Sequence, residues 1–366
     1  MNGYYTCNNK LFDNYYQGLD YSTKNGSFLN YSVSNDAIVA YTSVVPNFEK
    51  PTTTLAEEKL VKLRNENKKL HLHYSGGTDS HTILKIADKL GIEFDLITTE
   101  TNSITGNEYV DRDYTYAMNY CQGRKNYKTI VPTLEDYAMY DDPEWYMHCP
   151  GAVFTFRPNF AANWMSKHNL TGYVGITGLS KPNFYIDNDN NYYWVITDTQ
   201  INEYVGYDTC HFYIDEHHPE YAVSQVYAAK QFLENYKVSG WANTENICSY
   251  GFTLDEKKKF NAALGRILPD DPVIINASLG KNDASYLNPK SLRAMTELCE
   301  KGHNGVVAKF FHSVEHMKNR FKDTLYGLEI IDQQAARQLR IGAVFAVTDS
   351  GLKFVNHTEH PWNMPK

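Results

Sequence analysis

The stretch LHLHYSGGTDSHTIL, residues 70–84, decides how the fold of this chain is interpreted. Its apolar start predicts a short strand, and Ile83 and Leu84 begin an apolar face with helical spacing. Gly76 and Gly77 lie between the two, where the absence of a side chain lets the backbone turn sharply and approach an anion. The first N–H groups of a helix and the positive end of its dipole favour negative charge. The sequence therefore predicts a phosphate-binding loop between a strand and a helix.

Polar side chains in the same loop suit a nucleotide. Ser75, Thr78 and Ser80 supply hydroxyl donors. Asp79 offers a carboxylate for the divalent cation that accompanies nucleotide phosphates, and we expect it to hold Mg²⁺. His81 is a candidate general acid or base, because its ordinary pKa of about 6.5 suits neutral pH. The competing interpretation is a plain Gly-Gly turn in which a serine or aspartate caps the helix.

The loop is not a Walker A motif, which ends in Gly-Lys-Ser or Gly-Lys-Thr, because no such lysine follows Gly77. Residues 75–80, SGGTDS, resemble instead the SGGxDS signature of the PP-loop family, the N-type ATP pyrophosphatases. That resemblance implies that ATP is cleaved to AMP and pyrophosphate and that a carboxylate, amide or carbonyl oxygen is adenylated. It also implies a set of residues that contact ATP or pyrophosphate: Ser75, Gly76, Gly77, Thr78, Asp79 and Ser80.

Within that family, the chain looks most like asparagine-synthetase-like proteins of unknown substrate, which bacteriophages often encode. The resemblance is specific over about residues 70–97 and looser up to Asp198. It implies transfer of the adenylated acceptor to an amine or to ammonia. True asparagine synthetases also have an amidotransferase domain and a GxGxDE-type second motif, which this chain lacks. The acceptor, the ammonia source and the oligomeric state are therefore not set by the sequence.

Strand and helix patterns alternate after the first 54 residues, which predicts an α/β fold with a parallel, helix-covered sheet. The family resemblance implies a five-stranded sheet with helices on both faces, like that of the adenine nucleotide α-hydrolases. The loops after the strands would then meet at one edge of the sheet. Further strands are expected at 94–98, 128–131 and 172–177, and helices at 55–69, 107–121 and 158–167.

Three regions follow from these patterns. Residues 1–54 are expected to form a β-rich region of extended pieces and turns, including residues 37–45 and a turn at Asn25-Gly26. Residues 55–200 form the predicted ATP-binding domain. Residues 201–366 are predicted to be mostly helical, with helices at 219–237, 254–264, 289–301 and 306–326 and a hairpin turned at 349–351.

A second candidate loop, GLSKP at residues 178–182, follows the strand at 172–177. Lys181 is placed to neutralise charge on departing pyrophosphate and is a candidate catalytic residue. The alternative is a solvated lysine in a turn closed by Pro182. Asp187, Asp189 and Asp198 could hold magnesium, but a position in surface turns is the favoured interpretation. Glu100 and Glu108 could contact adenine or the acceptor, and this has weaker support than the magnesium role.

Histidines occupy two positions of the first predicted strand. Because buried parallel strands are usually apolar throughout, His71 and His73 are unusual there. We expect both either to point to one face of the sheet and be satisfied by hydrogen bonds, or to lie near an edge. His217 and His218 are expected at the entry to a helix, since no further ligands lie at a metal-binding spacing.

Composition limits the function. Hydrophobic residues make up 42% of the 366 residues, no apolar run is long enough to span a membrane, and the first residues carry no secretory signal, so we expect a cytosolic protein. The net charge of −8 does not indicate nucleic-acid binding. The six cysteines form no CxxC pair, which excludes the branches that bind clusters or zinc through such pairs. Two rival functions stay open: a nucleotide- or tRNA-modifying enzyme of the same fold, and a non-catalytic adenine-nucleotide sensor.

Overall fold

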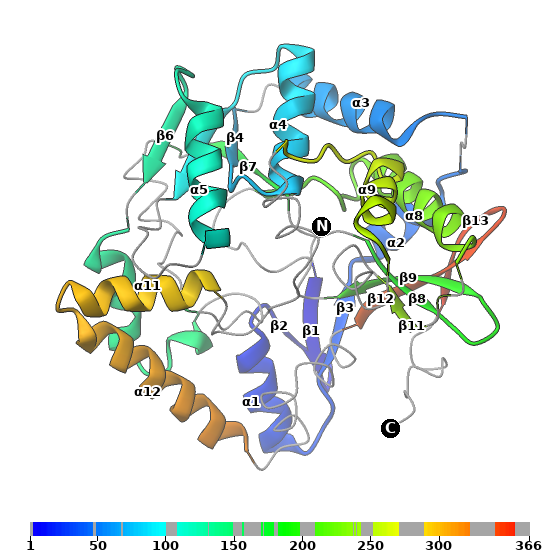
Figure 1. Ribbon diagram of the computed structural model, residues 1–366. Helices are drawn as coiled ribbons and strands as arrows, with labels where there is room; N and C mark the ends of the chain where they lie inside the picture. The colour runs from blue at the N-terminus through cyan, green and yellow to red at the C-terminus, as the bar shows by residue number, and fades with distance from the viewer. Residues whose placement is uncertain are drawn as a thin grey trace.

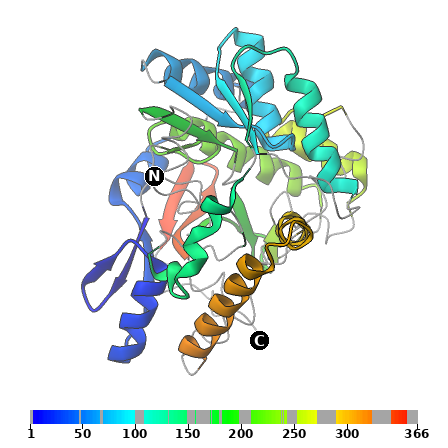
Figure 2. The same cartoon turned by 90° about the vertical axis from the view of Figure 1, so that its left-hand side faces the viewer.

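The computed structural model describes residues 3–46, 49–66, 69–99, 108–130, 132–148, 156, 170, 172–178, 182–197, 209–236, 238, 240–242, 252–270, 289–322 and 341–355. These ranges hold one parallel and two antiparallel sheets. Figure 2 shows the parallel sheet with its blue and cyan helices at the top, above the red hairpin near the C-terminus. None of the described helices is long and apolar enough to cross a membrane.

The parallel sheet contains the predicted strands. Its members are β4 (Lys69–His73), β5 (Asp95–Thr99), β6 (Tyr127–Ile130), β7 (Tyr173–Thr177) and β10 (Thr209–His211), in the order β10-β7-β4-β5-β6. All four neighbouring pairs run parallel, so the predicted α/β fold with a parallel sheet is confirmed. The order reverses at β4, since β5 lies on one side of it and β7 on the other. Ligands of such sheets bind beyond the carboxyl ends of the strands at this reversal.

One face of the sheet is covered by α3 (Thr52–Asn65), α4 (Thr78–Leu90) and α5 (Glu108–Cys121), and Figure 1 shows α4 and α5 on either side of β4. Their apolar side chains share a core with Leu70, Leu72 and Leu96, which alternate with residues of the opposite face. The helix predicted at 158–167 lies outside the described residues. The structure therefore shows helical cover on this face.

The opposite face carries the two unusual histidines. The rings of His71 and His73 lie 5.4 Å apart in an edge-to-face arrangement, so the prediction that they share a face is confirmed. Burial lowers the pKa of His71 to about 4 and that of His73 to about 3. Both rings are therefore neutral at neutral pH and contribute packing without charge.

The five-stranded antiparallel sheet joins distant parts of the chain. Its order is β11-β8-β9-β12-β13, with β8 (Asn183–Ile186), β9 (Tyr192–Thr197), β11 (Gly240–Ala242), β12 (Ile341–Thr348) and β13 (Gly351–Val355). Hairpins turn between β8 and β9 and between β12 and β13, and the second is the hairpin predicted at 349–351. Because β9 pairs with β12, this sheet crosses the predicted regional boundary at residue 200, as does the parallel sheet through β10.

The N-terminal region holds a three-stranded sheet and two helices. The strands are β1 (Gly3–Cys7), β2 (Lys10–Phe12) and β3 (Asn30–Val33), and the helices are α1 (Tyr15–Asn25) and α2 (Asn35–Thr42). The prediction of extended structure at 37–45 is wrong, because Ser34 caps a helix there by accepting a hydrogen bond from the Ala37 N–H. The Asn25-Gly26 pair ends α1, with Gly26 at a φ of 59°.

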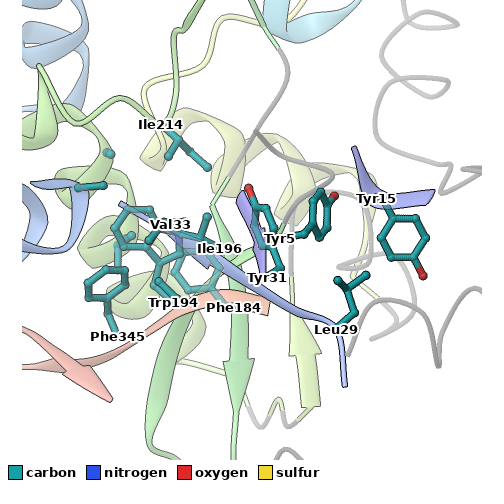
Figure 3. Close-up of a cluster of buried hydrophobic side chains, with 14 of the residues drawn as sticks. Tyr5, Tyr15, Leu29, Tyr31, Val33, Phe184, Trp194, Ile196, Ile214 and Phe345 are labelled. Carbon is teal, nitrogen blue, oxygen red and sulfur yellow. The ribbon is translucent and has the colours of Figure 1, made fainter. Parts of the chain in front are cut away.

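The largest core lies between the N-terminal sheet, the antiparallel sheet and the C-terminal helices α8 (Pro219–Leu233), α9 (Leu254–Ala263), α11 (Pro289–Glu300) and α12 (Asn304–Phe321). Figure 3 shows Trp194 between Phe184 and Phe345, and the Trp194 and Phe345 rings are stacked 5.2 Å apart. Helix α8 connects the cores, because its Tyr221 packs with the parallel sheet and its Val226 with this cluster. The helices predicted for this region are confirmed.

A buried ion pair fastens α3 to the turn between β10 and α8. Lys59 Nζ lies 3.1 Å from Asp215 Oδ2, and both side chains are almost fully buried. His218 Nδ1 lies 2.8 Å from the same oxygen. Burial alone would raise the pKa of Asp215, but Lys59 and His218 more than offset this and hold the pKa well below its ordinary value. Asp215 therefore stays ionised and needs its cationic partner.

We expect Lys59→Met to lower the free energy of unfolding by about 3–5 kcal/mol, because it leaves a buried carboxylate without its ammonium partner. Urea denaturation at neutral pH measures this. Lys89→Met is the matched control, since Lys89 pairs with Glu57 of α3 at the surface and should cost less than about 1 kcal/mol. Equal losses in the two variants would contradict the structural role given to the buried pair.

Candidate phosphate-binding site

The predicted phosphate-binding loop joins the carboxyl end of β4 to the start of α4. Gly76 has a φ of 80°, which favours glycine, and Gly77 caps the helix in an extended conformation without a side-chain cap bond. The first helical bond of α4 runs from the His81 N–H to the Gly77 carbonyl, at 2.9 Å. The N–H groups ahead of it lie at the positive end of the helix dipole.

Two serines fix the shape of the loop from within. The Ser75 and Ser80 hydroxyls are 3.2 Å apart, and the Ser75 N–H donates to Ser80 Oγ at 3.3 Å. The Gly77 N–H donates to Ser75 Oγ at 3.4 Å. Thr78 is buried at the first position of α4. The six residues thus form one compact turn, and their contact with ATP stays a prediction.

The loop after β7 lies directly against this turn. A Cβ atom on Gly178 would lie 3.0 Å from Asp79 Cβ and 3.0 Å from the Ser80 backbone nitrogen. Only glycine lets the two loops approach this closely without displacing the backbone. Lys181 lies outside the described residues, so its role at the site stays a prediction.

Two residues that the sequence analysis missed hold Asp79. Arg266 Nη1 donates to Asp79 Oδ1 at 2.8 Å, and the Arg266 side chain has no solvent exposure. The Tyr213 hydroxyl donates to the Asp79 carbonyl oxygen at 2.9 Å. The guanidinium carbon lies 4.7 Å from the centre of the Tyr213 ring, within the range of a cation–π interaction. The three groups form one cluster at the first turn of α4, in which Arg266 and Tyr213 are buried and Asp79 is partly exposed.

The segment after α9 positions this arginine. The Ile267 N–H donates to Thr82 Oγ1 at 2.9 Å, which fastens the residue next to Arg266 to α4. The signal in the sequence is weak: a single arginine within LGRIL, residues 264–268, surrounded by apolar residues. An isolated charge in such a run is a candidate for a buried ion pair, because an unpaired buried charge is costly.

The site suits an anion better than a bare metal ion. Among the described residues, no group of three or more histidine, cysteine, aspartate or glutamate side chains lies together as a metal site. Asp79 is the one carboxylate of residues 75–80, and Arg266 already contacts it. Mg²⁺ commonly binds through one or two carboxylates together with substrate phosphates. The expected role of Asp79 in holding Mg²⁺ is compatible with this arrangement and stays a prediction.

His81 is packed into an aromatic cluster beside the loop. It is 1% exposed, and its Nδ1 lies 2.9 Å from the Tyr74 hydroxyl. Its ring meets that of Tyr120 edge to face at 4.9 Å. Burial lowers the pKa of His81 to about 4, which keeps the ring neutral at neutral pH. The acid or base role stays a prediction, and the geometry favours packing.

The remaining candidates lie away from the loop or outside the described residues. The Asp187 carboxylate accepts hydrogen bonds from the Asp189 and Asn191 N–H groups, which fits the turn interpretation. His218 contacts Asp215 at the entry to α8, as its predicted helix-entry position implies. Asp198 and Glu100 lie outside the described residues, and of Glu108 the structure describes the backbone at the start of α5.

No protein-family model, curated protein or solved structure matches this chain. The resemblance to the PP-loop family therefore depends on residues 75–80 and their setting in the fold.

We expect Gly178→Ala to lower the free energy of unfolding by about 1–3 kcal/mol, because the added methyl group meets the backbone of Asp79 and Ser80. Urea denaturation measures the change. Gly305→Ala is the control, since a Cβ there meets no atom within 4 Å. A Gly178→Ala variant as stable as this control would show that the two loops are not in contact.

We expect His81→Gln to reduce the loss of stability on acidification from about pH 7 to about pH 5. In the wild type, the unfolded chain takes up a proton at a pKa of about 6.5, whereas the folded ring resists protonation until about pH 4. The wild type should therefore lose about 1–2 kcal/mol more than the variant. Urea midpoints at both pH values test this, and parallel losses would contradict a buried neutral His81.

Proposed function

We propose that this chain is an ATP pyrophosphatase that adenylates an acceptor and then passes the acceptor to a nitrogen nucleophile. The observation that supports this best is the position of the SGGTDS loop. It begins α4 at the carboxyl end of β4, where the order of the parallel strands reverses, with Gly178 of the β7 loop packed against it. A phosphate-binding motif in this position suits a nucleotide-binding site.

The loop residues would bind and orient the phosphates of ATP. Backbone N–H groups around Gly76 and Gly77 donate to phosphate oxygens, and Ser75, Thr78 and Ser80 add hydroxyl groups. The Ser75 and Ser80 contacts already fix the loop, so little reorganisation is required when charge develops on the leaving group. These groups favour departure of pyrophosphate by stabilising its negative charge.

The chemistry proceeds in two displacements. An oxygen of the acceptor attacks the α-phosphorus, the bond from that phosphorus to the bridging oxygen breaks, and pyrophosphate leaves. An amine or ammonia then attacks the activated carbon, and AMP leaves with the acceptor oxygen. Mg²⁺, when bound with the nucleotide, would neutralise charge on the phosphates. Lys181 is the proposed second source of positive charge near the departing pyrophosphate.

The acceptor belongs to a chemical class rather than to a named compound. A carboxylate, amide or carbonyl oxygen satisfies the first displacement, and the resemblance to asparagine-synthetase-like proteins favours a carboxylate. The partners of the reaction are therefore a small-molecule acceptor and an amine or ammonia donor.

The test is to incubate the full chain with ATP, Mg²⁺, ammonium and a pool of small carboxylic acids, and to measure AMP and pyrophosphate. Equal amounts of both products are expected. Asp79→Ala should lower the rate at least about 100-fold, because it removes the carboxylate that is proposed to hold Mg²⁺ and leaves the buried Arg266 without its partner.

Asp88→Asn is the matched control, because Asp88 lies on the same helix and pairs with Arg124 away from the loop. Its rate should equal that of the wild type. ADP and phosphate as products would contradict cleavage at the α-phosphorus. Tight ATP binding without turnover would favour the nucleotide-sensor alternative. Turnover that persists in Asp79→Ala would show that the catalytic site lies elsewhere.

A further inference from the structure

Arg266 has donors that the fold does not use. An arginine side chain carries five N–H donors, and in this structure Nη1 is directed to Asp79. Nε and Nη2 are buried and have no hydrogen-bond partner among the residues that the structure describes. Buried donors on a charged group are costly when they lack an acceptor. Their persistence beside a phosphate-binding loop indicates that an external acceptor completes them.

The two unused nitrogens form one edge of the guanidinium group. Nε–H and the nearer Nη2–H point in the same direction, which is the geometry that binds two oxygens of one phosphate or carboxylate group. The orientation of this edge is fixed, because Asp79 holds Nη1 and the Tyr213 ring lies under the guanidinium plane. A preorganised edge of this kind binds a ligand without first losing side-chain freedom.

This edge lies close to the loop. Since the guanidinium group is rigid and planar, Nη2 lies within about 5 Å of Asp79 Oδ1. Arg266 itself is 5% exposed, so water competes weakly for its donors. Since Asp79 engages Nη1, the Nε and Nη2 donors are the part of the guanidinium group that is left for an anion at the loop.

We propose that Arg266 is a phosphate-binding residue of this site and that its Nε and Nη2 donate to two oxygens of a polyphosphate held by residues 75–80. The residue acts from a segment 187 positions after Asp79. This inference rests on the proposed function, which identifies the ligand as the pyrophosphate part of a nucleotide. A carboxylate is the competing occupant of the same edge, and it makes no use of the loop N–H groups.

The decisive variant is Arg266→Lys, measured in the full chain by calorimetric titration with inorganic pyrophosphate. Lysine keeps the positive charge beside Asp79 but lacks the two-donor edge. If Arg266 only holds Asp79 in place, the affinity for pyrophosphate should be unchanged. If Arg266 binds phosphate directly, the affinity should fall at least about tenfold.

Arg124→Lys is the matched control, because Arg124 forms an ion pair with Asp88 at the other end of α4. Its pyrophosphate affinity should equal that of the wild type. Unchanged affinity in Arg266→Lys would overturn the proposal, as would absence of binding by the wild type at millimolar pyrophosphate. If Arg266→Lys lost affinity for succinate but not for pyrophosphate, the edge would be assigned to a carboxylate, and the proposal would also be overturned.

A second measurement covers the case in which Arg266→Lys does not fold. In the wild type, pyrophosphate should shift one arginine Nε–H signal in the nitrogen-15 spectrum, whereas chloride at equal ionic strength should shift none. No shift would refute the proposal. Both measurements follow binding and not turnover. The proposal for Arg266 can therefore be wrong while the protein still cleaves ATP. Conversely, pyrophosphate binding can depend on Arg266 even if ATP is not cleaved.

Discussion

A buried guanidinium requires a negative group beside it, and in this molecule that requirement connects the parts of the site. Arg266 has no solvent exposure, and the carboxylate that neutralises it belongs to Asp79 of the candidate phosphate-binding loop. Tyr213, which follows β10, contacts both members of the pair. The loop after β4, the end of β10 and the segment after α9 are therefore held at one point. Separating the loop from the segment after α9 would leave the Arg266 charge buried without its partner, and moving the end of β10 would remove the Tyr213 hydrogen bond.

Much of the parallel sheet could be predicted because its signals are local. The strand predicted before SGGTDS and the helix predicted after it are β4 and α4 of the structure. The error at 37–45 arose because an apolar run of that length fits a strand or a helix, and the Ser34 cap decided between them. The pairing of β9 with β12 could not be predicted, since it depends on contacts between residues far apart in the sequence.

The residues of the candidate site also fall into two groups, those that a local motif marks in the sequence and those that only the tertiary fold brings to the site. Residues 75–80 form one continuous motif, so sequence alone places them together. Arg266 and Tyr213 reach Asp79 only through the tertiary fold, and neither carries a motif of its own. His81 shows the opposite case: its sequence position beside the loop favours acid or base chemistry, but its neighbours Tyr74 and Tyr120 bury the ring and keep it neutral.

The interleaving of the two five-stranded sheets has a consequence for synthesis of the chain. Strand β9 leaves the ribosome well before β12, its partner through the Val195–Val344 register. Until β12 is made, that edge of β9 exposes backbone N–H and carbonyl groups together with Val195 and Trp194. Such an edge favours pairing with other chains. Strand β12, which is translated later, therefore covers an edge of β9 that could otherwise pair with other chains.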